Sequence, residues 1–459
     1  MFNVRVAHRS FHRFLFLDSG GGLAYRFFTM QKLSCFVYVF MFTACIGPFA
    51  GKKVTPWLAG PPALKVNFSS EEAAALLVWD QAPVEGFLHY EIQRSSGGDF
   101  ATVAQVQSVS DTSFSDRGLL ANENYRYQVL SVFGEKEKVH QLASTSVEGG
   151  FHHQVNAWGL PTGFAPTRLA VSREGTVFAV GARQGLVERF DRTGNSLGGL
   201  VYTREALACM ETSALDGPSL ALDQEDNLYV VYNLQREGRQ PEAFWSKFAP
   251  DGGLLWTRPL AGLFARHIVI DGEEIYIESI SQLQQFDRSG ERQVQYAIPA
   301  LLVSSLRFWQ GRFAALIEPL SLREGDWQAP RLVVYDDAER GSTVQVIGRD
   351  PKSHQDRGSG LLRRPTDFAV DEVSARAFVV NAGQDRIEVF RGDDYLTRWG
   401  EEGDAEGQFR FSGDIEVVVN MANGEKAERH VMAGGIARDA EGFVYIADTF
   451  NDRIQKFEP

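Results

Sequence analysis

The chain from about residue 150 onward alternates short apolar runs with clusters of turn-forming residues. In the last copy, apolar runs cover residues 436–437, 443–447 and 454–457, and turn residues occupy 439–442 and 449–452. Short β-rich runs joined by such tight turns predict antiparallel strands. The middle run does not alternate as a strand with one face in water would. We therefore expect it to be buried on both faces, between stacked sheets.

This three-run pattern recurs at intervals of roughly 40–50 residues, a period typical of β-propellers. Earlier copies start near residues 166, 218, 267, 306 and 365. Together with the last copy they make about six units, so the sequence predicts an all-β repeat architecture.

The last two copies resemble the NHL repeat. The resemblance is carried by Tyr445-Ile-Ala-Asp with Asn451-Asp-Arg-Ile-Gln-Lys-Phe, and by Trp399-Gly with Gly403 and Gly407-Gln-Phe. It implies that residues 149–459 form a six-bladed β-propeller.

The last repeat lacks a fourth strand after residue 457, and an earlier segment is a candidate to supply it. Val155-Asn-Ala-Trp158-Gly159 is similar to Leu396-Thr-Arg-Trp399-Gly400, which occupies the fourth-strand position of the preceding repeat. We expect residues 153–158 to form the missing outer strand, closing the ring and leaving no unpaired edge.

Residues 63–148 show a different strand rhythm, with alternation at 64–68 and turn signals between later runs. This segment resembles a fibronectin type III domain. The resemblance implies that Trp79 is the core indole, that Leu119 and Tyr125-x-Tyr127-x-Val129 mark the sixth strand, and that Tyr125 is the corner tyrosine. Residues 122–124 replace the usual Pro-Gly-Thr turn. A spacer between membrane and propeller is the favoured role, and a ligand site is the alternative.

The N-terminal region, residues 1–44, is interpreted as a signal region whose true start is Met30. Residues 30–32 supply a charged segment, and residues 33–44 supply an apolar run of signal-peptide length. Phe42-Thr-Ala-Cys45 resembles a bacterial lipobox, although Phe42 departs from the usual Leu, and implies lipidation at Cys45. The alternative is a plain signal peptide with Cys45 incidental. Residues 45–62 are interpreted as a tether. Because of the apolar run and the lipobox-like residues, we expect an exported lipoprotein of the cell envelope.

The net charge and the cysteine content limit the kinds of binding partner and of cross-link that we expect. The formal net charge is −13 and no basic cluster occurs outside the N-terminus, which argues against a nucleic-acid partner. Cys35 and Cys45 lie in the N-terminal apolar run, so Cys209 alone is left for the folded part and no disulfide framework is expected. We expect a monomer without a cofactor, in contact with the membrane through a lipid anchor only.

Possible chemistry is sparse. Asp448, Asn451 and Arg453 sit at a strand end and its turn, and Asn381, Asp385 and Arg386 repeat the arrangement, which favours architecture over catalysis. The acids Asp223, Asp271, Asp371 and Asp439 likewise recur after the first run of each repeat, which favours turn chemistry. His267 is the one histidine expected to face the channel, although a lone histidine is more often a packed residue than a metal ligand.

Two classes of function remain open. The first is a non-enzymatic binding or scaffold protein that presents propeller loops to a protein, peptide or glycan. The second is a hydrolase or lyase that uses the central channel and is similar to propeller lactonases or peptidyl-hydroxyglycine lyases. Asn423-Gly424 predicts a hairpin over residues 414–432, and residues 205–217 and 322–330 form other long excursions. The candidate partner-binding residues are Asp414, Glu416, Asn423, Glu428 and His430.

Overall fold

The protein is all-β in the part of the chain that the structure describes. The computed structural model describes residues 60–135, 138–181, 185–205, 217–234, 240–279, 282–297, 302–318, 329–337, 342–353, 356–415 and 429–459. Its helices within these ranges include the short 3-10 turns Ala382–Gln384 and Thr449–Asn451. No helix in these ranges is long and apolar enough to cross a membrane. The N-terminal region, with Met30 and Cys45, lies outside the described residues.

The first eight strands build two antiparallel sheets. One contains β1 (Leu64–Ser69), β2 (Ala74–Trp79) and β5 (Ser113–Arg117). The other contains β4 (Ala101–Val106), β3 (Phe87–Ser95), β6 (Tyr125–Glu135), β7 (Lys138–Ala143) and β8 (Val147–Gly149).

The side chains that carry the sandwich resemblance lie in the core of this segment. Trp79 is buried and its ring meets Tyr90 edge-on, with centroids 5.2 Å apart. Leu119 is buried, and Leu120 N donates a hydrogen bond of 2.9 Å to the Tyr125 hydroxyl. Tyr125 therefore ties the start of β6 to the chain just before it.

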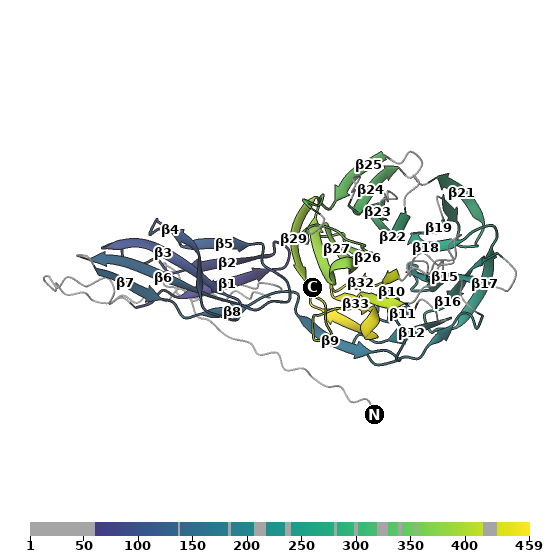
Figure 1. The fold of residues 1–459 in the computed structure, drawn as a ribbon, viewed down its shortest axis with the longest axis horizontal. Helices are drawn as coiled ribbons and strands as arrows, with labels where there is room; N and C mark the ends of the chain where they lie inside the picture. The colour runs from purple at the N-terminus through teal and green to yellow at the C-terminus, as the bar shows by residue number, and fades with distance from the viewer. Residues whose placement is uncertain are drawn as a thin grey trace, which may run out of the picture. The chain divides into compact units, whose positions relative to one another are not determined.

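The rest of the chain forms four-stranded antiparallel sheets (Figure 1). The first three consist of β10 (Pro166–Val171), β11 (Val177–Gly181), β12 (Leu186–Phe190) and β13 (Leu200–Val201); β14 (Ser219–Leu222), β15 (Leu228–Leu234), β16 (Glu242–Phe248) and β17 (Leu254–Leu260); and β18 (Ala265–Asp271), β19 (Glu274–Ser279), β20 (Gln282–Phe286) and β21 (Arg292–Ala297). The next three consist of β22 (Leu302–Trp309), β23 (Arg312–Glu318), β24 (Arg331–Asp337) and β25 (Ser342–Ile347); β26 (Asp367–Asp371), β27 (Arg376–Asn381), β28 (Arg386–Arg391) and β29 (Asp394–Trp399); and β32 (Gly435–Arg438), β33 (Val444–Asp448), β34 (Arg453–Phe457) and β9 (Gln154–Gly159).

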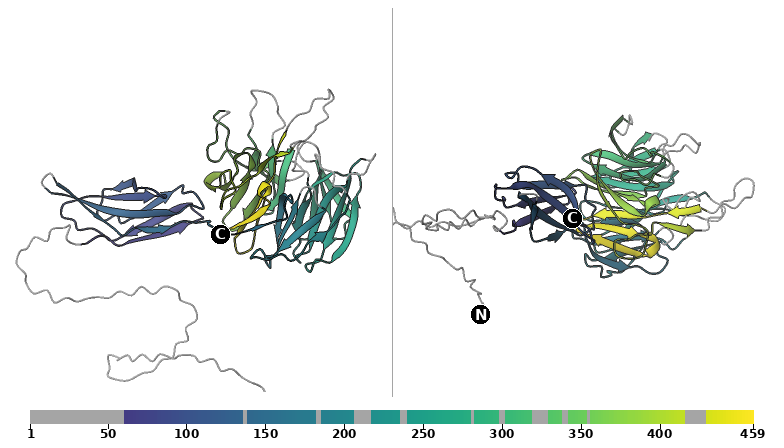
Figure 2. Two further views of the ribbon diagram at one scale, coloured as in Figure 1. Left: turned by 60° about the horizontal axis from the view of Figure 1, so that its bottom comes forward. Right: turned by 60° about the vertical axis from the view of Figure 1, so that its left-hand side comes forward.

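The first strands of these sheets contact one another in a closed cycle, in the order β10, β14, β18, β22, β26, β32 and back to β10. Figure 2 shows neighbouring sheets stacked face to face. Every residue of the second strands β11, β15, β27 and β33 is buried, as expected for strands covered on both faces. This arrangement is a β-propeller.

The ring is closed by β9, which pairs antiparallel with β34. Trp158 lies opposite Ile454, as Trp399 lies opposite Ile387 in the preceding sheet. The prediction that a segment from the start of the propeller supplies the outer strand is confirmed, with β9 covering Gln154–Gly159 where residues 153–158 were expected. The packing repeats as well, because each tryptophan contacts the phenylalanine that ends the third strand of the next sheet: Trp399 meets Phe457 at 5.4 Å and Trp158 meets Phe190 at 6.0 Å.

His152, just before β9, anchors the closing strand. Its ring stacks on Trp399, 5.7 Å apart at 26°, and meets Phe378 edge-on. Its Nδ1 lies 2.8 Å from the carbonyl oxygen of Glu458, and its Nε2 lies 3.5 Å from a nitrogen of Arg376. One residue thus joins the start and the end of the propeller.

The expected hairpin begins as a pair of strands. β30 (Ser412–Ile415) pairs antiparallel with β31 (Arg429–Met432), and Asp414 lies opposite His430. Glu416, Asn423 and Glu428 lie outside the described residues.

Replacing Trp158 by alanine should weaken ring closure. Trp158 is partly buried between Tyr445 and Phe190, so its loss should lower the free energy of unfolding by about 2 kcal/mol in urea titrations. Val155→Ala, at an exposed position of the same strand, is the matched control and should change it by less than about 0.5 kcal/mol. Equal midpoints for the two variants would contradict the role assigned to Trp158.

Acid should destabilise the closure through His152. Burial lowers the pKa of His152 to about 4, and the positive charges of Arg376 and Arg438 act in the same direction, while the Glu458 carbonyl opposes them. The folded protein keeps the ring neutral, whereas the unfolded chain binds a proton below about pH 6.5. Stability from this group is therefore complete above about 6.5 and is lost as the pH falls toward 4, by on the order of 3 kcal/mol.

The measurement is urea unfolding at pH 7.5 and 4.5, compared between the native chain and His152→Asn. Asparagine tolerates the positive φ of 53° at this position, so the variant keeps the backbone conformation. The loss of stability between the two pH values should be smaller in the variant. Burial raises the pKa of Asp385 to about 6, an effect of opposite sign that both proteins share. An identical pH dependence in the two proteins would refute the assignment to His152.

Candidate functional site

The recurring aspartates that follow the first strands serve the turns. Asp223 Oδ1 accepts hydrogen bonds of 3.0 and 2.9 Å from the backbone N–H groups of Glu225 and Asn227. Asp439 Oδ1 accepts equivalent bonds of 3.0 and 2.9 Å from Glu441 and Phe443. These are Asx-type turns that fix the hairpin between the first and second strands.

Asp448 is the centre of a buried hydrogen-bond cluster. Its carboxylate accepts bonds from the backbone N–H of Arg410 at 2.7 Å, and from side-chain nitrogens of Asn451, Arg453 and Gln455 at 2.9, 2.7 and 3.0 Å. The Asp448 side chain is fully buried. All these donors come from the last sheet or from the segment leading to it, so the cluster holds the sheet together.

Two further aspartates join one sheet to the next. Asp452 accepts bonds of 2.6 and 2.7 Å from the N–H groups of Gly163 and Ala165, just before β10. Asp385, at the equivalent place one sheet earlier, accepts a bond of 2.7 Å from Phe411. Both have left-handed φ values near 45°, which aspartate tolerates better than most residues.

We call face A the end of the ring where the first strands begin, marked by Arg168, Arg266 and Ser304. The strand ladder is irregular here in β10, β18 and β22, at Thr167, Arg266 and Ser304 respectively. Such bulges redirect side chains. Arg168 donates a 3.0 Å bond to Ser304 O, and Arg266 donates a 2.7 Å bond to Val303 O. Two arginines from different sheets therefore converge on β22.

His267, the expected channel residue, is fully buried on β18. Its Nδ1 lies 2.9 Å from Glu278 Oε2, and its Nε2 lies 3.0 Å from Ser304 O. Both neighbours are oxygen atoms, one from the Glu278 carboxyl and one from the Ser304 carbonyl. Burial lowers the pKa of His267, while Glu278 acts in the opposite direction. Both ring nitrogens are therefore engaged within the protein.

Asp367 links three first strands from a fully buried position at the start of β26. Its Oδ1 accepts bonds of 2.6 Å from Ser305 Oγ and 2.8 Å from Arg307, both on β22. Its Oδ2 accepts a bond of 3.1 Å from Ile436 N on β32. The carboxylate is thus shared between neighbouring sheets, which fixes their spacing.

Glu318, at the end of β23 and also on face A, was not found by sequence reasoning. Burial raises the pKa of its carboxyl, and the charges of Arg364 and Arg266 act against that shift. Glu318 is half-buried, and a carboxyl with a raised pKa is a candidate for proton transfer. No local motif marks Glu318, because its environment depends on the packing of separate sheets.

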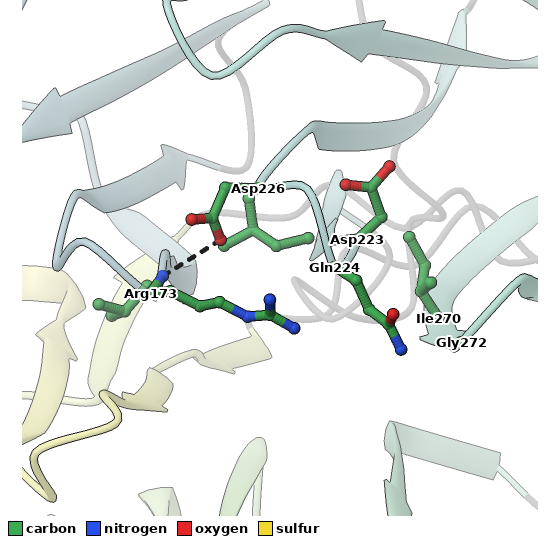
Figure 3. Close-up of a pocket in the computed structure, with 8 residues that line it drawn as sticks. Arg173, Asp223, Gln224, Asp226, Ile270 and Gly272 are labelled. Atoms are coloured by element: carbon green, nitrogen blue, oxygen red, sulfur yellow. Dashed lines mark hydrogen bonds between the residues drawn. The ribbon is translucent and has the colours of Figure 1, made fainter.

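A pocket opens at the opposite end of the ring, which we call face B, where the first strands end. It has a volume of about 230 Å³ and lies at the ends of β10, β14 and β18 (Figure 3). Its lining consists of Val171, Arg173, Leu222, Asp223, Gln224, Asp226, Ile270 and Gly272.

The partner-binding residues expected from sequence are only partly described. Asp414 and His430 are paired on β30 and β31, whereas Cys45, Cys209 and most of the 205–217 and 322–330 excursions lie outside the described residues. Across the ranges that the structure describes, no group of three or more His, Cys, Asp or Glu side chains is placed to hold a metal ion.

Asp448→Ala should destabilise the fold, because it removes the buried carboxylate that accepts bonds from Arg410 N–H and from the side chains of Asn451, Arg453 and Gln455. The expected loss of unfolding free energy is about 3 kcal/mol, measured by urea denaturation. Asp394→Ala, an exposed acid on the neighbouring sheet, is the control and should be near neutral. Unchanged stability in Asp448→Ala would show that the cluster is not architectural.

No protein-family model matches the chain, and no curated protein matches it either. Among solved structures it is similar to Kuenenia stuttgartiensis hydrazine synthase, at 13% identity and a TM-score of 0.41, over 68% of this chain and 99% of that one. It is also similar to virginiamycin B lyase from Staphylococcus aureus (12% identity, TM-score 0.38, 66% and 98% of the two chains) and to the Neurospora crassa Pan2 WD40 domain (10%, 0.39, 67% and 95%). These neighbours are β-propeller proteins at low identity, and the similarity does not extend to activity.

Proposed function

We propose that the chain is a non-enzymatic binding or scaffold protein of the cell envelope, whose propeller loops bind a protein, peptide or glycan. In this proposal residues 1–44 are a signal region, Cys45 carries a lipid, and residues 45–62 are a tether. Residues 63–148 are a fibronectin type III spacer, and residues 149–459 are a six-bladed NHL-type propeller.

Two sets of contacts support the proposed sandwich and the proposed repeats. The grouping of β1, β2 and β5 against β4, β3, β6 and β7, with a buried Trp79 and a bonded Tyr125 hydroxyl, supports a fibronectin-type sandwich. The equivalent placing of Trp158 and Trp399, and of Asp452 and Asp385, supports repeats of one type.

The observation that carries the binding role is that polar side chains of the first strands, and of β19 beside them, bond to other groups of the protein. His267, Glu278, Asp367 and the two converging arginines contact protein groups, which is the arrangement of a rigid disc. A rigid disc with long connections suits recognition by loops.

Face A is the proposed partner surface. Successive antiparallel strands reverse direction, so connections from fourth to first strands and from second to third strands all start from strand ends on this face. The β30–β31 pair lies in one such connection, between β29 and β32, and the 205–217 and 322–330 excursions fall in others. We propose Asp414, Glu416, Asn423, Glu428 and His430 as contact residues.

The alternative, a hydrolase or lyase, is favoured by one observation. Glu318 is a partly buried carboxyl with a raised pKa on the same face, close enough to Arg266 and Arg364 for their charges to act on it. Such a group could hold a proton for transfer to a substrate.

Deleting residues 414–432 should remove the main partner in a pull-down from envelope extract, because the proposed contacts lie on that hairpin. The deletion also removes Val431, which is buried, and Met432, which packs on the core, so the unfolding midpoint of the deleted chain is measured beside the pull-down to show that it is folded. Glu318→Gln is the comparison variant and should retain the partner. An unchanged partner set after the deletion would exclude the hairpin, and loss of a hydrolytic or lyase activity in Glu318→Gln would favour the enzyme.

A further inference from the structure

The pocket on face B has the composition of a small-ligand site. Its side walls are apolar, with Val171, Leu222 and Ile270 at the ends of three neighbouring first strands. Polar residues of the following turns, Arg173 and Gln224, form its rim. Apolar walls with a few convergent polar groups are the usual make-up of ligand pockets.

Arg173 and Gln224 supply the polar anchors. Figure 3 shows both side chains extending toward the same open space from neighbouring turns. The Arg173 backbone N–H donates a 3.1 Å bond to Asp226 Oδ1, which fixes the turn that carries the side chain. Within the described part of the chain, the Arg173 guanidinium and the Gln224 amide make no hydrogen bond or ion pair. Their bonding capacity is therefore available to a ligand.

Two acidic side chains line the pocket, and they differ in their partners. Asp223 accepts bonds from Asn227 Nδ2 at 3.0 and 2.9 Å, and its Oδ2 lies 3.1 Å from Lys247 Nζ. Figure 3 shows the Asp223 carboxylate pointing away from Arg173 and Gln224. Asp226 is engaged with the Arg173 backbone through one oxygen. The Arg173 guanidinium and the Asp226 carboxylate are therefore the charges that border the open space, with Asp223 paired to Lys247.

Gly272 borders the third side of the pocket. Its φ is +57°, and a Cβ at this position would lie 4.0 Å from the Gln224 amide nitrogen, at the edge of the pocket. The volume of about 230 Å³ has room for roughly eight water-sized groups, since a water occupies about 30 Å³. The pocket therefore fits a ligand of amino-acid size.

We propose that this pocket binds the α-carboxylate of an apolar amino-acid residue, either a free amino acid or the C-terminal residue of a peptide. Arg173 pairs with the carboxylate, for which a guanidinium is the best-matched side chain. Gln224 bonds the adjoining carbonyl or amide, and the aliphatic side chain rests on Val171, Leu222 and Ile270. The site is separate from the loops of face A and does not depend on the function proposed for them.

Binding is tested by calorimetric titration of the full chain with N-acetyl-leucine, N-acetyl-glycine and leucinamide. N-acetyl-leucine should bind, N-acetyl-glycine more weakly because it lacks the apolar side chain, and leucinamide least because it lacks the carboxylate. Arg173→Gln should weaken N-acetyl-leucine binding roughly tenfold or more, the loss of one charge-assisted contact. Glu372→Gln, on the equivalent turn after β26 and outside the pocket, should leave it unchanged.

The source of the ligand is decided by the same titration with free leucine and with an acetylated peptide ending in leucine. Tighter binding of free leucine supports an amino-acid site, with Asp226 facing the ammonium, and tighter binding of the peptide supports a terminus site. Equal binding of leucinamide and N-acetyl-leucine, an Arg173→Gln variant that binds as well as the native chain, or no heat with any ligand would overturn the proposal. None of these outcomes depends on the 414–432 hairpin.

Discussion

The pairing of β9 with β34 is the contact on which the rest of the ring depends. The other propeller sheets are formed by four strands consecutive along the chain, whereas the last sheet needs a strand from the start of the propeller. His152 and Glu458, 306 positions apart, meet at its end. Without this strand, β34 would present an open row of backbone donors and acceptors, and the first sheet would lose the packing that Trp158 gives to Phe190.

Buried polar side chains in the interior of the ring also hold neighbouring sheets together. Asp367 bonds to β22 and β32 from its place on β26, and Arg168 reaches from β10 to Ser304 on β22. A buried carboxylate or guanidinium is costly unless its partners are fixed, so these groups tolerate little change in the spacing of the sheets. The charges of the ring interior therefore select one arrangement of the sheets, in addition to any stability they add.

The second strands and the closing strand could be predicted from sequence because their signals are local. β33 is a continuous apolar run, and Trp158 repeats the Trp399 pattern. The outer strands β13, β17, β21 and β25 were not predicted: several of their side chains are exposed, and short, partly polar strands have no clear period. Arg168, Arg266 and Glu318 could not be found either, because their environment arises only when bulged strands of different sheets meet. The pocket has the same origin, since Arg173 and Gln224 become neighbours only when β10 and β14 pack together.

Because the chain is synthesised from its N-terminus, the closing strand β9 is made before its partner β34. A polypeptide emerges from its N-terminal end, so β9 exists long before β34, and the intervening sheets form while the two edges are apart. During this interval residues 154–159 can pair with any other exposed edge, including that of another chain. Closing a ring over so many residues is also entropically costly, which makes it a slow, late step of folding. The strand that completes the molecule is thus also an unpaired strand until the last sheet has formed.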